Sequence, residues 1–262
     1  MKAVRPLILV TNDDGIIAPG IRNLVEIAKE FGEVIVVAPD TPQSAKGHAI
    51  TIHDIIRVNK VQVFDDVESY SCSGTPVDCV KMAKHTLLKG RQIDLCISGI
   101  NHGSNASVNI IYSGTMSAAM EASMEGIKAI GFSLCDFSFE ADFSAARYYI
   151  WKLIGWALNT DMNSCKLLNV NIPKLPFDSI KGIKICRQAE ARWQEDFLEN
   201  KDPNGRNYYW LSGKFVCDDR DNDTDIWALD EGYVSVVPCH HDLTHYGALE
   251  SYKHVEYNSD EQ

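Results

Sequence analysis

The sequence lacks several features that assign proteins to common classes. Its 262 residues contain no apolar run of about 18 residues, so no membrane-spanning helix is expected. The apolar stretch 7–10 is too short for the core of a secretory signal peptide. Only 9 prolines occur, and 45% of the residues are hydrophobic, which excludes an extended disordered chain. We therefore expect a folded protein without membrane contact, located in the cytoplasm.

Positive charge is also scarce. The 25 lysines and arginines are outnumbered by 36 acidic residues, and the net charge is −11. Nucleic-acid binders usually carry a basic face that displaces counterions from phosphates, so nucleic acid is excluded as a main partner. A small anionic substrate remains compatible, because a bound metal ion can reverse the local field.

The eight cysteines form no CxxC pair, and most lie in apolar stretches. This pattern favours buried thiols in a reducing compartment over zinc ligands or disulfides. An even count alone would also fit four disulfides, but the cysteines are scattered over a long chain. We therefore expect free thiols.

Apolar patterns of two kinds alternate along the first two thirds of the chain. Short β-rich runs are expected to form strands, and stretches with helical periodicity are expected to form helices between them. The expected strands are 7–10, 34–38, 95–98, 129–133 and 167–172, and the expected helices are 21–28, 77–88, 115–125 and 145–158. Two further strands, 49–52 and 57–64, could form a hairpin at the edge. The rhythm predicts an α/β fold with a mostly parallel sheet flanked by helices.

The composition changes after Pro173 and Pro176. Isolated strands are expected at 183–187, 208–211 and 233–237, separated by the polar tracts 195–206 and 218–225. We interpret residues 179–262 as a β-rich C-terminal appendage. Surface loops are an equally good interpretation of the acidic tract.

Two adjacent carboxylates follow the first expected strand. Asp13 and Asp14 come at its carboxyl end, where an open α/β sheet places its ligand crevice. Adjacent carboxylates repel each other, so keeping both ionised is costly unless a cation lies between them or water solvates them. Such hard oxygen ligands suit Mg²⁺, Mn²⁺ or Ca²⁺. The pair is therefore a candidate metal site.

The same segment is compatible with other structures. The residues T-N-D-D-G also fit an ordinary turn, which is favoured when they are taken alone. A dinucleotide site is disfavoured, because GxGxxG is absent and two negative charges stand where pyrophosphate would lie. Asp40 imitates a ribose-binding acid, although a turn beside Pro39 and Pro42 is favoured.

Polar loops after the other strands could complete the site. Ser44 could offer a neutral oxygen to a metal and Lys46 could meet a phosphate, while Asn101 offers a carbonyl and Asn105 can donate to substrate. The segment Ser113-Gly114-Thr115 opens a helix, where free N–H groups bind anions, and Ser113 or Thr115 could also act as a plain cap. Residues 73–76 also open an expected helix, with a proline near its first position, and there helix capping is the favoured role. The combination, without GxSxG, P-loop or HExxH, indicates metal-assisted chemistry on a phosphate.

Three histidines near the end of the chain, His240, His241 and His245, have a spacing that could bind zinc. No acidic partner stands at a set spacing, so a structural or interfacial role is favoured. A contribution to the phosphate site from an exchanged tail stays open.

The motifs V-T-N-D-D-G-I-I-A-P-G-I, V-V-A-P-D-x₃-S, S-G-T-P-V-D-C-V, S-G-I-N-H-G-S-N, Y-S-G-T-M-S-A-A-M-E and G-Y-V-S-V-V-P closely resemble the stationary-phase survival protein family, SurE. The resemblance implies a Rossmann-like catalytic core, here 1–178, and a metal-dependent 5′/3′-nucleotidase that in some members also acts on short polyphosphate. Family metal ligands map onto Asp13, Asp14, Ser44 and Asn101. Positions around the phosphate map onto Asn105, Ser113, Gly114 and Thr115.

The resemblance also implies a partner and a cofactor. It predicts one divalent cation per subunit, Mg²⁺ or Mn²⁺, and a homodimer or homotetramer in which the segment 179–262 is exchanged between subunits. Asn109 and His102 depart from the pattern expected of many members. We expect that neither contacts the proposed ligands, so substrate preference and not reaction type is in question.

The predicted reaction is hydrolysis of a nucleoside monophosphate by metal-activated water, with Asp13 and Asp14 as catalytic residues and Asn101 also near the substrate. Which aspartate is the base is open, and so is the preferred nucleotide. An alternative mechanism makes Asp13 a nucleophile that forms an aspartyl-phosphate. The rival function is a non-catalytic nucleotide-binding module that uses the same loops.

Overall fold

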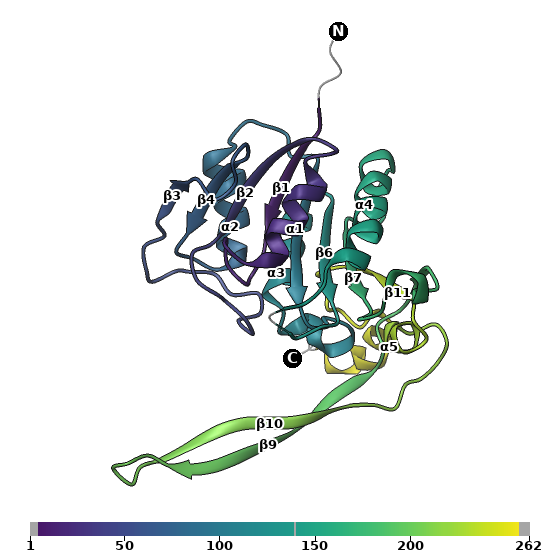
Figure 1. Cartoon of the computed structure of the whole chain (residues 1–262). Helices are drawn as coiled ribbons and strands as arrows, with labels where there is room; N and C mark the ends of the chain where they lie inside the picture. Colours follow the sequence, from purple (N-terminus) through teal and green to yellow (C-terminus); the bar gives the residue numbers. More distant parts are fainter. Residues whose placement is uncertain (1–4, 139, 257–262) are drawn as a thin grey trace, which may run out of the picture.

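A central sheet organises the molecule in the computed structural model, which describes residues 5–138 and 140–256 (Figure 1). Its strands, in spatial order, are β3 (Val58–Val61), β4 (Glu68–Cys72), β2 (Glu33–Pro39), β1 (Leu7–Thr11), β5 (Leu95–His102), β6 (Ala129–Leu134), β7 (Leu167–Ile172), β11 (Val234–Cys239) and β8 (Ile183–Ile185). All neighbouring pairs are parallel except β3–β4 and β7–β11. The predicted α/β class with a mostly parallel sheet is confirmed.

The sheet is buried on both faces because its central strands are apolar on both sides. In β1, Ile8 and Val10 pack into one hydrophobic cluster, and Leu7 and Leu9 pack into the other. Helices α1 (Pro19–Ala28) and α4 (Ser144–Asn159) cover the first face. Helices α2 (Pro76–Met82) and α3 (Gly114–Met124) cover the second, and α2 continues into a single π-helical turn, η1 (Ala83–Leu87).

The edge next to β4 differs from the prediction. Residues 49–52 are not a strand, so the predicted hairpin with residues 57–64 is wrong, and β3 pairs instead with β4. Side-chain hydrogen bonds compete with strand pairing here, since Thr75 Oγ1 donates to the Ala49 carbonyl and Thr51 Oγ1 donates to Asp78. Strand β4 has a polar sequence, E-S-Y-S-C, which gave no apolar signal. The capping interpretation of residues 73–76 is confirmed by a capping box between Thr75 and Asp78.

The C-terminal third contains a long hairpin. Strands β9 (Ala191–Lys201) and β10 (Asn207–Cys217) pair antiparallel over their full lengths, so the polar tract 195–206 is mostly strand. Figure 1 shows this ribbon projecting away from the body of the molecule, on the side of the carboxyl ends of β6 and β7. The acidic tract 218–225 is a loop that binds Arg187 through Asp219 and Asp223 and leads into α5 (Asp225–Asp230).

The remainder of the C-terminal third belongs partly to the main sheet, through β8 and β11. Short helices complete the described chain, namely η2 (Ser107–Ile111), η3 (Phe177–Ser179), η4 (Tyr246–Ala248), α6 (Leu249–Tyr252) and η5 (Lys253–Val255). The division at residues 178 and 179 stays a prediction. All eight cysteines lie in the described ranges and are free thiols. Within residues 5–138 and 140–256, no helix is long and apolar enough to cross a membrane.

Candidate metal and phosphate site

The sheet reverses its direction of growth between β1 and β5. From β1 the chain moves outward to β2, and it later returns to add β5 on the other side of β1. In open α/β sheets, ligands bind outside the carboxyl ends of the strands at such a switch point. Asp13 and Asp14 directly follow β1, and Asn101 lies near the end of β5. The two predicted ligand segments therefore meet at the expected place.

Asp13 is buried against the first turn of α3. Its side chain accepts a 2.5 Å hydrogen bond from Thr115 Oγ1, and the residue is only 3% exposed. A Cβ atom at Gly114 would lie 2.6 Å from Asp13 Cβ, so only glycine permits this approach. The Asp13 carbonyl accepts a 2.7 Å hydrogen bond from the backbone N–H of Gln43. Asp13 thus joins β1, α3 and the loop after β2.

Burial and the neighbouring charge make this carboxylate costly to ionise. Burial, and then the charge of Asp14, raise the pKa of Asp13 to about 6, although the hydroxyl and backbone N–H of Thr115 act in the opposite direction. Burial also raises the pKa of Asp14, partly offset by the charge and backbone N–H of His102. A cation beside both carboxylates would remove the repulsion. The electrostatics therefore favour a bound cation.

The end of β5 shapes the other side of the site. Its pairing with β6 shifts register between Ser98 and Asn101, an irregularity of the kind that re-aims side chains next to active sites. The amide nitrogen of Asn101 donates to the Gly103 carbonyl at 2.9 Å and to the His102 carbonyl at 3.3 Å. The Asn101 amide oxygen is thereby left as the atom available to a metal. The imidazole of His102 pairs with the Ser138 carbonyl through Nδ1 at 3.0 Å, while the charge and backbone N–H of His102 lower the pKa of Asp14.

The loop after β2 carries Ser44 and Lys46, and both residues are exposed. Gln43 anchors the loop to Asp13, and the backbone N–H of Gly47 donates to the Tyr112 carbonyl at 3.2 Å. The tip 44–46 is thus tied down at both ends and adjoins Asp13. Ser44 directly follows Gln43, so the loop brings it to the side of the site where Asp13 lies; whether Ser44 binds a metal stays a prediction.

The N-terminus of α3 provides free donors at the same edge. Ser113 caps the helix by accepting from the backbone N–H of Met116 at 3.0 Å, so its predicted capping role is confirmed. The N–H of Met116 serves this cap and the N–H of Thr115 serves Asp13, so the Ser113 hydroxyl hydrogen and the N–H of Gly114 are the donors that the positive helix end offers a phosphate. Whether Ser113, Gly114 and Thr115 bind phosphate stays a prediction.

Asn105 is held by a buried polar network that our sequence interpretation missed. Its side-chain nitrogen donates to Ser133 Oγ at 2.8 Å, and its backbone N–H donates to Asn171 Oδ1 at 2.7 Å. Asn169 donates to the Asn105 carbonyl at 2.8 Å and accepts from Asn171 at 2.9 Å. The signal was available, because two asparagines two residues apart in a buried strand point to the same face.

The donor atoms fit a hard divalent cation. Asp14 Oδ2 and Asn12 Oδ1 are buried, and among the described residues neither has a hydrogen-bond partner. Such orphaned oxygens are expected where a cation or bound water completes the site. In the parts of the chain that the structure describes, no group of three or more His, Cys, Asp or Glu side chains could hold a metal. The three C-terminal histidines therefore form no such group, and a metal at this edge would need neutral oxygens beside the two carboxylates.

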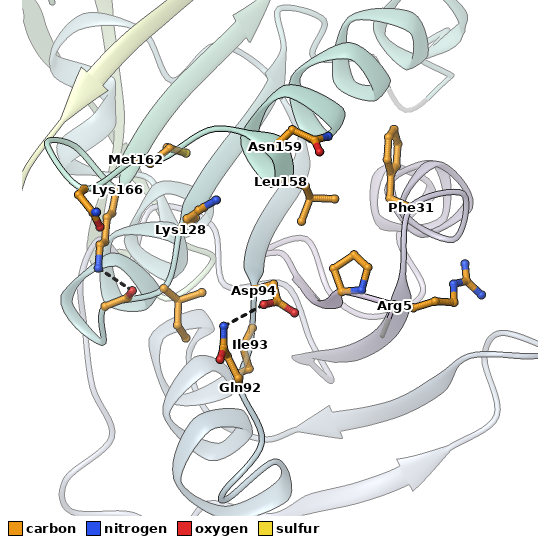
Figure 2. Close-up of a pocket in the computed structure, with 14 residues that line it drawn as sticks. Arg5, Phe31, Gln92, Ile93, Asp94, Lys128, Leu158, Asn159, Met162 and Lys166 are labelled. Atoms are coloured by element: carbon orange, nitrogen blue, oxygen red, sulfur yellow. Dashed lines mark hydrogen bonds between the residues drawn. The ribbon is translucent and has the colours of Figure 1, made fainter. Parts of the chain in front are cut away.

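A separate cavity lies at the opposite edge of the sheet. Figure 2 shows its lining side chains, which include Arg5, Asp94 and Lys128 just before β1, β5 and β6 and others around the end of α4; its volume is about 670 Å³. Lys128 donates to the carbonyls of Ala157 and Thr160. The cavity lies at the amino ends of the strands, beside the end of α4, whereas Asp13 and Asp14 lie at the carboxyl end of β1. It is therefore remote from the carboxylate pair.

Comparison with known proteins agrees with the resemblance. The family described as Survival protein SurE matches residues 8–195. The chain is 59% identical over 246 residues to the 5′-nucleotidase SurE of Christiangramia forsetii, covering 93% of this chain and 94% of that protein. It is 54% identical to the 5′-nucleotidase SurE of Flavobacterium psychrophilum, covering 97% and 99%. The crystal structure of the SurE protein from Aquifex aeolicus superposes with a TM-score of 0.83 at 38% identity, covering 96% of this chain and 100% of that one.

Proposed function

Because the chain belongs to the SurE family, whose relatives are 5′-nucleotidases, we propose that it hydrolyses nucleoside 5′-monophosphates to nucleoside and phosphate with one divalent cation, Mg²⁺ or Mn²⁺, per subunit. Nucleoside 3′-monophosphates and short polyphosphate are further substrates in this proposal. The observation that carries it is the carboxylate pair after β1, in which buried Asp13 contacts the N-terminus of α3 and half-buried Asp14 follows it directly.

The metal would be held by Asp13, Asp14, Ser44 and Asn101. A divalent cation bound there supplies Lewis-acid polarisation of a phosphate oxygen and a more acidic water. Thr115 orients Asp13, and the Gly103 carbonyl orients Asn101 through its amide nitrogen. These side chains are fixed before substrate arrives, and such positioning contributes much of the acceleration in phosphoryl transfer.

The phosphate would lie at the start of α3, beside Ser113, Gly114 and Thr115, with Asn101 and Asn105 donating to it from the other side. Asp13 or Asp14 would accept the proton of the attacking water. The alternative is attack by Asp13 itself. Stereochemistry at phosphorus separates the two, because one in-line attack by water inverts a chiral phosphate monoester, whereas two successive displacements through an aspartyl-phosphate retain its configuration.

The hairpin supports self-association. Phe197, Trp210 and Leu211 are 61%, 64% and 63% exposed on a ribbon that projects from the body (Figure 1). A two-stranded ribbon is marginally stable alone in water, and exposed apolar side chains of this size usually mark an interface. We propose a homodimer or homotetramer in which residues 179–262 are exchanged, and a cytoplasmic location.

The proposed activity is tested on purified protein with a panel of mononucleotides in Mn²⁺, Mg²⁺ or EDTA. Phosphate release in metal and none in EDTA is expected, and Asp14→Asn should abolish release while the circular dichroism spectrum is unchanged. Nucleotide binding without phosphate release under every condition would favour the non-catalytic rival. Near-normal turnover by the Asp14→Asn variant would contradict the role given to this carboxylate.

A further inference from the structure

Helix α3 carries a buried acid two turns beyond the phosphate end. The Glu121 side chain is only 4% exposed, and its carboxylate is bound by Lys81 of α2 and by His48 Nε2, the latter at 2.9 Å. Burial raises the pKa of Glu121, but the bonds from Lys81 and His48 outweigh it and hold the pKa below its usual value. A buried carboxylate needs such partners, because an unpaired one is strongly disfavoured. The ion pair with Lys81 alone could compensate the negative charge of Glu121. The additional hydrogen bond from His48 therefore has another role.

His48 ends the loop that carries Ser44. On one side of the loop tip, Gln43 is bonded to Asp13, and on the other side Gly47 and His48 are bonded to Tyr112 and Glu121. The tip 44–46 is exposed between these anchors. The contact to Tyr112 is long, at 3.2 Å, so the side chain of His48 provides the shorter tie on that side.

One helix therefore fixes both parts of the site. Thr115 in the first turn of α3 binds Asp13, and Glu121 lies six residues further, about 9 Å along the axis. The same rigid element thus sets the position of the buried carboxylate and the position of the loop that approaches it. Without the His48 bond, this side of the loop would be held only by the 3.2 Å bond from Gly47, so the loop would sample more conformations, and ordering it would weaken metal binding.

We propose that the His48–Glu121 hydrogen bond is a latch that holds the loop after β2 against α3 and places Ser44 for the metal, which makes His48 a positioning residue. The inference rests on the proposed metal site. The ring of His48 is 32% exposed and contacts α3 from the surface, so its removal leaves the core intact.

The test uses the full-length protein in four forms: wild type, His48→Ala, His48→Gln and His85→Ala. Glutamine keeps an N–H donor at similar reach and should restore the latch. His85 is the matched control, because its Nε2 also pairs at 2.9 Å with a glutamate of the α3 C-terminus, Glu125, but it lies on η1, away from the loop.

Two readouts are measured against Mn²⁺ concentration: the metal-induced rise in Tm and the rate of phosphate release from AMP. For His48→Ala, the Mn²⁺ concentration at half-effect should rise about tenfold in both, with a much smaller change in kcat at saturating Mn²⁺. His48→Gln and His85→Ala should behave like wild type. The Tm of each variant in EDTA verifies folding.

An unchanged Mn²⁺ half-point in His48→Ala, or an equal shift in His85→Ala, would overturn the latch. A loss in His48→Ala that His48→Gln does not restore would equally overturn it, since the donor would then be irrelevant. If the wild type releases no phosphate from any nucleotide, the proposed function fails, yet the Tm titration still decides whether His48 tunes metal binding.

Discussion

The hydroxyl of Thr115 donates a 2.5 Å hydrogen bond to Oδ1 of Asp13, joining residues 102 positions apart in the sequence. The bond opposes burial, which disfavours the charged form of Asp13. A hydrogen bond to a charged group contributes about 1.5–3 kcal/mol. This contact is therefore a main support of the ionised carboxylate that the metal requires.

Replacing Thr115 by valine keeps the shape of the side chain but removes the hydroxyl. We expect Thr115→Val to weaken Mn²⁺ binding about tenfold or more, because the pKa of Asp13 rises further. Isothermal titration with Mn²⁺ measures the effect. Thr115→Ser keeps the hydroxyl and should stay within a few-fold of wild type. Equal affinities for the valine and serine variants would show that this hydrogen bond does not support the site.

Adding one methyl group at Gly114 should disturb the site directly. The new Cβ would lie 2.6 Å from Asp13 Cβ and 2.9 Å from its Oδ2, so Asp13 must shift. Small displacements of catalytic groups can lower rates about 100-fold, and we expect Gly114→Ala to lower kcat/KM by about that factor. Gly155→Ala, in the helix α4, is the control, because its Cβ meets only the Phe31 ring. If Gly114→Ala kept the wild-type kcat/KM, the position of Asp13 against α3 would not be required for catalysis.

The raised pKa of Asp13 predicts a pH dependence of the metal-free protein. Between pH 3.8, the ordinary value, and about 6, the folded state keeps a proton that the unfolded state has lost. Asp13 therefore lowers the free energy of unfolding as pH rises through this window, by about 3 kcal/mol in total. Asp13→Asn removes the effect and should be more stable than wild type in EDTA at pH 7.5 but similar at pH 4. Urea unfolding at both pH values decides this, and a less stable asparagine variant at pH 7.5 would contradict it.

The asparagine network predicts a role for Asn171, which lies behind the site. Asn171→Ala leaves the buried N–H of Asn105 without its acceptor, which costs about 1–3 kcal/mol of unfolding free energy. We expect at least a tenfold loss of kcat/KM as well, because Asn105 then loses its fixed position. Asn159→Ala, at an exposed position of α4, should change neither quantity. An Asn171→Ala enzyme that loses stability but keeps wild-type kcat/KM would remove Asn105 from the substrate site.

The projecting hairpin predicts an effect of charge on assembly. Trp210 is 64% exposed on β10, and a glutamate there would be strongly disfavoured inside an apolar interface. Trp210→Glu should therefore shift the protein toward monomer in size-exclusion chromatography with light scattering. Lys201→Glu, at the far end of β9, is the charge control. If wild type and Trp210→Glu have the same molar mass, this part of the hairpin is not in the interface.

The sequence predicted the parts of the fold that depend on local patterns. Apolar runs such as 7–10 and 129–133 mark central strands because both of their faces are buried, and the carboxylates follow the first run directly. Ser113 was correctly predicted as a possible cap, since capping depends on neighbouring residues. The place of Asp13 and Asp14 at the sheet edge followed from strand order alone.

Features that depend on distant residues were missed. Strand β4 is polar and owes its place to pairing with β2 and β3, and the polar tract 195–206 became a strand because β10 pairs with it. The spacing of Asn169 and Asn171 marks a polar face in a buried strand, but their hydrogen bonds with Asn105 span more than 60 residues, so the local pattern does not show which residue they bind. The influence of His102 on the pKa of Asp14 likewise acts between the end of β5 and the turn after β1, so no local pattern shows it.

The separation of Asp13 from Thr115 also has a consequence for synthesis of the chain. Ribosomes add about 5–20 residues per second, so the two carboxylates are made about 5–20 s before the hydroxyl that binds one of them. Contacts between distant residues form late in folding, because the intervening chain must be ordered first. Nascent chains shorter than about 115 residues hold the acidic pair without the helix end that confines it. We therefore expect tight metal binding only in nascent chains long enough for β5 and α3 to have packed against β1.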